Sequence, residues 1–205
     1  MFSQLAFLAI LPSLTLSHAG APTAAQILAN CKKAYDSVNT FEVEAKAASG
    51  MLNATAHISF SRSSGLRVTG DTSFGSKYEL LLVGKSAQVY NGGSWAQAKT
   101  PEIGLATITG ISATAPTQVC SLLLHTQWGA LAPASLANYS ISEEKVRGRD
   151  TYRLRSNGQM RSTVWIDKKT FFLVKSHAEI FKTNIDVVLS TPKVNQVIPS
   201  SRFLK

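Results

Sequence analysis

Histidine, serine and paired carboxylates are the residue types in this sequence that could carry out chemistry, and the histidines are widely scattered. The four of them are His18, His57, His125 and His177. No two lie at the spacing of metal ligands, so the sequence predicts no metal site. His57 and His177 alternate with apolar neighbours, which favours strand positions that face solvent. His125 is expected at a helix end, where a cation interacts favourably with the helix dipole.

A serine and a lysine at hydrolase spacing occur in Ser142-Glu-Glu-Lys145. In hydrolases with a Ser-x-x-Lys motif the serine is the nucleophile, but the Ser-Asp-Asn and Lys-Thr-Gly motifs that accompany it are missing from this sequence. Glu143 and Glu144 are adjacent, so on a strand they point to opposite faces and cannot share a proton. The sequence also lacks a nucleophile elbow and the glycine motifs that bind phosphates or dinucleotides. We therefore expect no catalytic residue and no cofactor, with a hydrolase using Ser142 and Lys145 as an alternative.

The two cysteines, Cys31 and Cys120, fall on the apolar faces of segments with helical periodicity. In an oxidising compartment they could form a disulfide. Cysteine is also among the residues most often buried as a free thiol. Both outcomes remain open from the sequence.

Two helices are predicted around these residues. Thr23-Ala-Ala-Gln26 is typical of a capping box and opens a helix that runs to about Val38. A second helix is expected from Pro116 to near Gly129. Between the strands, Thr100–Ala113 is rich in small and β-branched residues, which indicates a long loop or lid.

Alternation of apolar and polar residues fills most of the remaining chain. Apolar residues share one side of a strand over 41–47 and again over 54–60, and turn residues separate the two runs. Asn91-Gly-Gly-Ser94 and Asp167-Lys-Lys-Thr170 are typical of hairpin turns. We find no βαβ pattern, so we expect an α+β fold, mainly β, with one strongly curved antiparallel sheet.

Aromatic residues occur on nearly every predicted strand. They either pack as a core against the two helices or leave part of the concave side unfilled, because a curved sheet with few helices is difficult to fill. An unfilled concave side would form a cavity large enough for an acyl chain. Burying an acyl chain there would release about 0.8 kcal/mol for each methylene.

Charge and composition limit the partners. The chain has 205 residues, 44% hydrophobic and 16% charged, which suits a single domain with a sizeable core. Lys and Arg number 21 against 12 Asp and Glu, a formal net charge of +9. The excess of positive charge either lies on a solvated surface without a partner, or attracts anionic lipid headgroups or an acidic partner. The cations are scattered along strands, so we expect no nucleic acid partner.

The first 19 residues resemble a secretory signal. Leu5–Leu16 is an apolar run, and Ser17-His18-Ala19 fits the small-x-small cleavage pattern, although no Lys or Arg precedes the run. We predict cleavage after Ala19 and one exported domain over 20–205; the alternative is a buried N-terminal segment. No later segment reaches about 18 uncharged apolar residues, the length of a membrane span.

Several segments resemble the LolA-like outer-membrane lipoprotein carriers and their periplasmic relatives. Val164–Lys175 looks like the Trp-Ile-Asp-x-x-Thr hairpin of that family, and Lys193–Phe203 is similar to its closing segment. Tyr35–Phe41 and Val83–Tyr90 also fit. The resemblance implies a periplasmic protein whose curved sheet forms an incomplete barrel, with two or three helices as a lid over an apolar cavity that takes up acyl chains.

The resemblance also implies a latch. In the carriers an arginine at a strand end, in an Arg-Pro-Asn context, hydrogen-bonds to the lid and keeps it shut until cargo arrives. Arg62 occupies that place here, with Ser63 in place of the proline. The same fold serves periplasmic stress sensors that bind lipidic or protein signals.

These observations lead to one functional expectation and one alternative. We expect a non-catalytic, monomeric periplasmic carrier of acyl chains of lipoproteins or lipids. The alternative is an envelope sensor or interaction module that docks a membrane protein. The residues expected to line the apolar cavity are Phe41, Val43, Ile58, Phe60, Leu80, Leu82, Trp95, Leu122, Leu123, Trp165 and Val174.

Overall fold

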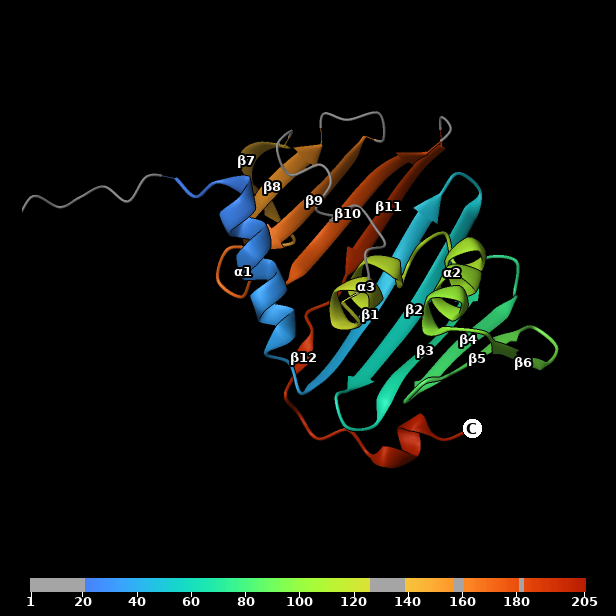
Figure 1. Ribbon diagram of the computed structural model, residues 1–205. Coiled ribbons are helices and arrows are strands. Elements are labelled where there is room, and N and C mark those ends of the chain that lie inside the picture. The colour runs from blue at the N-terminus through green and yellow to red at the C-terminus, as the bar shows by residue number, and fades with distance from the viewer. Residues whose placement is uncertain (1–20, 126–138, 157–160, 181–182) are drawn as a thin grey trace, which may run out of the picture.

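A computed structural model describes residues 21–125, 139–156, 161–180 and 183–205. The predicted signal segment, its cleavage point after Ala19 and the predicted helix end near Gly129 lie outside these residues. Within them, one antiparallel sheet of twelve strands dominates the molecule, in the order β6-β5-β4-β3-β2-β1-β11-β10-β9-β8-β7, with β12 paired to β1. The sheet does not close, because β6 and β7 form its two edges (Figure 1). The predicted fold class is confirmed.

The strands follow one another as a meander, broken only by the helical segment and by the return of β11 to β1. Their bounds are β1 (Thr40–Ser49), β2 (Leu52–Ser61), β3 (Gly65–Thr72), β4 (Lys77–Val83), β5 (Ser86–Asn91), β6 (Trp95–Ala98), β7 (Tyr139–Val146), β8 (Arg149–Ser156), β9 (Ser162–Asp167), β10 (Leu173–Ile180), β11 (Thr183–Leu189) and β12 (Lys193–Val194).

Three α-helices lie over one face of this sheet: α1 (Ala24–Asp36), α2 (Pro101–Ile111) and α3 (Thr117–Leu123) (Figure 1). Helix α1 begins with the predicted capping box. The Gln26 backbone N–H donates to Thr23 Oγ1 at 3.2 Å, and the Thr23 N–H donates to Gln26 Oε1 at 2.8 Å. Its buried face carries Ile27, Cys31 and Tyr35, three residues that recur at helical spacing.

The prediction of a loop over Thr100–Ala113 is wrong, because most of this segment is helix α2. Thr100 caps the helix by accepting the Ile103 N–H at 3.3 Å, Pro101 occupies the first turn and Glu102 lies at the positive end of the dipole. These start signals, together with packing on β4 and β5, outweigh the low helix propensity of the isoleucine, threonine and glycine residues that follow.

The strand register places the predicted apolar residues on the face that the helices cover. Phe41 lies opposite Phe60 and Val43 lies opposite Ile58 across β1 and β2. The same rows continue through Leu66, Leu82 and Ala87, and through Val68, Leu80 and Val89. We call this side the inner face. The other side, the outer face, carries the alternating polar residues of these strands.

Two local features shape the C-terminal half of the sheet. Asp167 Oδ1 accepts the N–H groups of Lys169 and Thr170 at 2.9 and 2.8 Å, which holds the predicted turn between β9 and β10. A bulge between Leu173 and Lys175 then shifts the pairing of β10 with β9. After β12 the chain ends in a short 3-10 helix, η2 (Ser200–Phe203), which packs on β3; there Arg67 Nη1 donates to the carbonyls of Arg202 and Leu204.

Candidate functional site

The inner face forms an apolar surface beneath the three helices. The eight predicted cavity residues that belong to it or pack against it are Phe41, Val43, Ile58, Phe60, Leu80, Leu82 and Leu123, all buried in the hydrophobic core, and Leu122, which is half-buried against that core. Leu80 and Ile58 are at most 1% exposed, so the helices shield this surface from solvent.

Trp95 does not lie on this surface, which corrects its predicted place. It pairs with Tyr90 across β5 and β6, and Tyr90 alternates with the inward Val89. Its ring packs 5.7 Å from the Tyr90 ring, and Lys205 Nζ lies 5.1 Å from its centroid. Trp95 is therefore a residue of the outer face near the chain end.

Trp165 also lies on the outer face, and this prediction is likewise corrected. It sits opposite Arg153 on β8 and Lys175 on β10, whereas its neighbours Val164 and Ile166 point inward. Val174 is fully buried at the bulge but does not join the core beneath the helices. A large apolar residue type suggested an inward position, but strand parity and the bulge decide the face.

Helix α2 approaches the inner face through a glycine. A Cβ atom on Gly104 would lie 2.9 Å from Leu80 Cδ1 and 3.5 Å from Ala87 Cβ. The absence of a side chain therefore allows the helix backbone to lie directly on β4 and β5. Gly110, six residues later, has no neighbour within 4 Å of such a Cβ.

Helix α1 is fixed to the sheet by an aromatic cluster of Tyr35, Phe41 and Phe172. Their ring centroids are 5.1 to 5.6 Å apart. Tyr35 Oη accepts the Leu173 N–H at 3.4 Å, and burial raises the pKa of this phenol well above its ordinary value. The cluster joins α1, β1 and the turn before β10 through contacts that exclude water.

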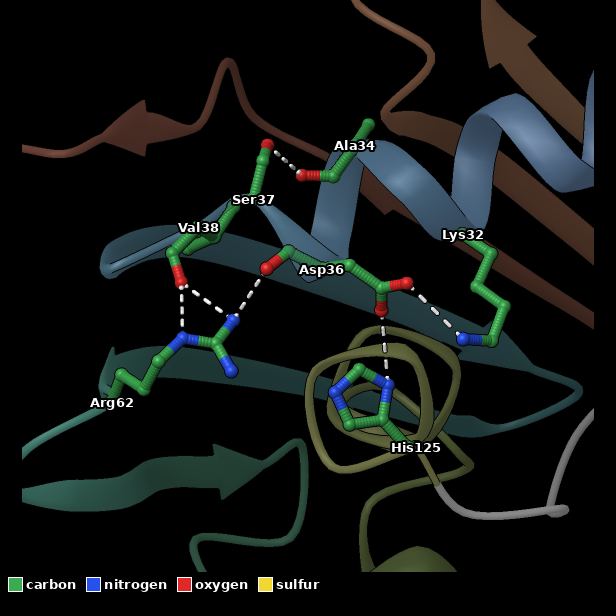
Figure 2. A network of polar contacts seen from close by, with 7 residues as sticks. All are labelled: Lys32, Ala34, Asp36, Ser37, Val38, Arg62 and His125. Carbon is green, nitrogen blue, oxygen red and sulfur yellow. Dashed lines mark hydrogen bonds and ion pairs between the residues drawn. The ribbon is translucent and has the colours of Figure 1, made fainter.

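The side chain of Arg62 reaches from the end of β2 to the last turn of α1. Its Nε and Nη2 donate to the Val38 carbonyl at 3.1 and 2.8 Å, and Nη2 also donates to the Asp36 carbonyl at 2.8 Å (Figure 2). Carbonyls at a helix C-terminus lack partners within the helix and attract cations. The guanidinium also lies 5.9 Å from the centroid of the inward Phe60 ring. Arg62 thus bridges the sheet and one of its covering helices.

Asp36, the last residue of α1, connects this bridge to the end of α3 (Figure 2). Its Oδ1 lies 3.1 Å from His125 Nδ1, just after α3, and its Oδ2 lies 3.1 Å from Lys32 Nζ. His125 follows a helix as expected, but it pairs with another helix, which no local pattern in the sequence indicates. We call Arg62, Asp36 and His125 the latch network, since these three residues connect β2, α1 and the end of α3.

Cys31 and Cys120 are both free thiols, and both are buried in the core. Burial raises the pKa of Cys31 to about 12 and also raises the pKa of Cys120. Neither thiol is therefore activated as a nucleophile, because the reactive form is the thiolate.

The remaining reactive side chains do not converge within the described residues. Ser142 and Lys145 are three positions apart on β7, so they point to opposite faces, and Lys145 pairs with Asp150 at 3.6 Å. Glu143 contacts Lys168 while Glu144 accepts the Trp165 Nε1–H, so these carboxylates also diverge. No group of three potential metal ligands occurs among the residues described. None of the described helices has both the length and the apolar character needed to cross a membrane.

Comparison with known proteins shows similarity in structure alone. No protein-family model and no curated protein matches the sequence. LprF from Mycobacterium bovis matches with a TM-score of 0.50 and 16% identity, over 88% of this chain and 98% of LprF. An uncharacterized conserved protein from Thermus thermophilus matches with a TM-score of 0.55 and 11% identity, over 89% of this chain and 93% of the matched chain.

A third match is the Pseudomonas aeruginosa MucA/MucB complex, with a TM-score of 0.50 and 15% identity, over 89% of this chain and 60% of the matched chain. At these identities the matches establish the fold. They agree with the open curved sheet and covering helices implied by the resemblance of the sequence. The chain therefore shares its fold with these proteins, an open curved antiparallel sheet with helices over one face.

Proposed function

We propose that this protein is an exported, non-catalytic binder of acyl chains, carried on lipids or lipoproteins, and that the inner face is the binding surface. The observation that supports this most is the junction between Arg62 and α1. A wide apolar surface lies under helices, and a polar contact at its border joins the sheet to the helix that covers it. The resemblance of the sequence implies that the carriers have their latch arginine at this place.

The energies of opening and filling this site are compatible. Breaking the three hydrogen bonds of Arg62 costs about 1 kcal/mol each, or somewhat more because the donor is charged. Burying ten methylenes of an acyl chain would contribute about 8 kcal/mol. An acyl chain can therefore offset the loss of the latch network and part of the helix packing, whereas a short polar ligand cannot. The apolar lining thus favours a long aliphatic ligand.

A second function is supported by a different observation. The edge strand β7 is exposed along most of its length, and among the described residues no strand pairs with its free side. Such an edge can receive a strand of a partner protein. The MucA/MucB complex shows that a protein with this fold can take part in a protein assembly. Recovery of one membrane protein from native membranes, unaffected by fatty acid, would favour this function.

The main proposal is tested by titrating the purified protein with a fluorescent long-chain fatty acid. We expect saturable binding by the wild type and tighter binding, by about a hundredfold, in Arg62→Ala, since losing three hydrogen bonds of about 1 kcal/mol each lowers the cost of opening by a factor of that order. Arg149→Ala is the matched control, because among the described residues Arg149 donates to Thr191 Oγ1, at 2.7 Å, and not to a helix. Absence of saturable binding in all three proteins would refute the proposal.

A further inference from the structure

A recess lies on the outer face of the sheet, opposite the helices. It has a volume of about 300 Å³ and is formed by side chains of β8, β9, β10 and β11 together with Arg161, just before β9. Its lining residues are Arg153, Arg155, Arg161, Thr163, Trp165, Lys175, His177, Glu179 and Asp186. We call it the basic hollow. The inner apolar surface contributes none of these residues.

Trp165 gives the basic hollow a rigid centre. The Arg153 guanidinium lies 5.6 Å from one of its ring centroids and Lys175 Nζ lies 4.9 Å away, so two cations flank the indole. Its Nε1–H donates to Glu144 Oε2 at 2.9 Å, which fixes the orientation of the ring. Only 6% of Trp165 is exposed, although it lies on the outer face. The stems of the flanking cations cover it, as long charged side chains commonly do.

Positive charge exceeds negative charge in the basic hollow. Four permanent cations, Arg153, Arg155, Arg161 and Lys175, face three carboxylates: Glu179 and Asp186 in the lining, and Glu144 beside Arg153 and Trp165. The excess is therefore one positive charge. The carboxylates are already engaged: Asp186 lies 2.9 Å from Lys175 Nζ, and Glu179 lies 3.9 Å from Arg161. The charge excess is therefore not neutralised by the lining itself.

Two of the arginines retain hydrogen-bonding capacity. Arg155 is exposed and has no ion-pair partner among the described residues. Arg153 Nε is buried and lies 3.7 Å from Glu144 Oε2, which is too long for a hydrogen bond, so it has no hydrogen-bond partner in the described structure. A buried N–H donor without a partner is costly, and a bound acceptor would remove that cost.

The cation at the other side of the hollow is held in place. Burial by itself would raise the pKa of Asp186, but the hydrogen bond and charge of Lys175, with the charge of His177, outweigh it and hold the pKa below its ordinary value. Asp186 therefore stays ionised and fixes Lys175 beside the indole. The arrangement is organised before any ligand arrives, which lowers the entropic cost of binding.

From this geometry we propose that the basic hollow is a binding site for a phosphate group, carried either by an anionic lipid headgroup or by free phosphate. Arginine forks match phosphate oxygens in pairs, and the excess of positive charge in the hollow attracts a phosphate anion. The site lies on the face opposite the acyl-chain surface, so this proposal stands or fails independently of the proposed function.

The test compares wild type with Arg155→Ala/Arg161→Ala, two exposed positions whose replacement should leave the fold intact. One arm measures inorganic phosphate binding by calorimetry, and the other measures cosedimentation with phosphatidylglycerol vesicles against phosphatidylcholine vesicles. We expect binding in at least one arm, weakened about tenfold or more in the double variant, since charged hydrogen bonds are lost. Lys85→Ala, an exposed cation on the turn between β4 and β5, is the control and should bind as wild type does.

The two arms identify the source of the phosphate. Binding of inorganic phosphate would assign the site to a free anion, and binding only to phosphatidylglycerol vesicles would assign it to a headgroup. Absence of binding in both arms would overturn the proposal. So would binding that the double variant and the Lys85 control weaken equally, because that would reflect overall charge and not the basic hollow.

Discussion

Arg62 combines two requirements at the residue scale. Its guanidinium satisfies carbonyls at the end of α1 that the helix leaves without partners, and its stem places the charge beside the inward Phe60 ring. The serine at position 63, where the carriers have a proline, does not prevent this contact. The fork geometry of arginine is essential to it, because lysine cannot donate from two nitrogens at once.

The buried thiols give a prediction at this scale. Because burial raises the pKa of Cys31 from 9.0 to about 12, this thiol stays protonated in the folded protein at pH 9.5, where the unfolded thiol ionises. Folding is therefore favoured by this group below pH 9 and loses that contribution as pH rises toward 12. Iodoacetamide at pH 9.5 should label Cys31 and Cys120 only at the rate of unfolding, as followed by intact mass. Rapid labelling of both thiols in the folded protein would contradict their burial.

The grouping of residues on one side of a strand is predicted more reliably from the sequence than whether that side faces the core or the solvent. Alternation correctly grouped Phe41 with Val43, and Ile58 with Phe60. The large apolar side chains of Trp95 and Trp165 suggested inward positions. The pairing of Trp95 with Tyr90 and of Trp165 with Arg153 places both on the outer face. On the outer face, cation–π contacts stabilise a large aromatic ring. A single sequence does not show which charged residues lie beside that ring on the neighbouring strands.

At the element scale, α2 shows how local signals and composition can conflict. Thr100, Pro101 and Glu102 form a good helix start, yet the following residues have low helix propensity. The helix persists because packing on β4 and β5 rewards its formation. The pairing of His125 with Asp36 is of a different kind. It joins segments far apart in the chain, so only the folded structure reveals it.

Two glycines of α2 allow a matched test of its contact with the sheet. Alanine in place of glycine stabilises a helix interior by about 1 kcal/mol. Gly110→Ala should show part of this gain, because Gly110 lies in the last turn of α2 and its Cβ meets no neighbour within 4 Å. Gly104→Ala should lose the gain or become destabilising, because its Cβ would lie 2.9 Å from Leu80 Cδ1. Urea unfolding of both variants measures the difference, and equal effects would show that α2 does not lie directly on β4.

At the scale of the whole molecule, the open sheet separates two chemical surfaces. The inner face is apolar and covered by helices, whereas the outer face carries charge pairs and the basic hollow. Under the two proposals, the inner face binds an acyl chain while the outer face stays free for an anionic surface. The curved sheet and the covering helices were predictable from alternation and from the resemblance of the sequence. The position of the basic hollow was not, since it depends on register across four strands.

The central claim, that acyl chains bind against the inner face, is tested most directly by photocrosslinking. A long-chain fatty acid with a diazirine near its methyl end is bound, irradiated and mapped to single residues by mass spectrometry. Because strand neighbours alternate between faces, we expect attachment at inward positions such as Val43, Ala45 and Ile58, and not at Glu42 or Glu44. Attachment to the outward set alone, to both sets equally, or to neither would contradict the account.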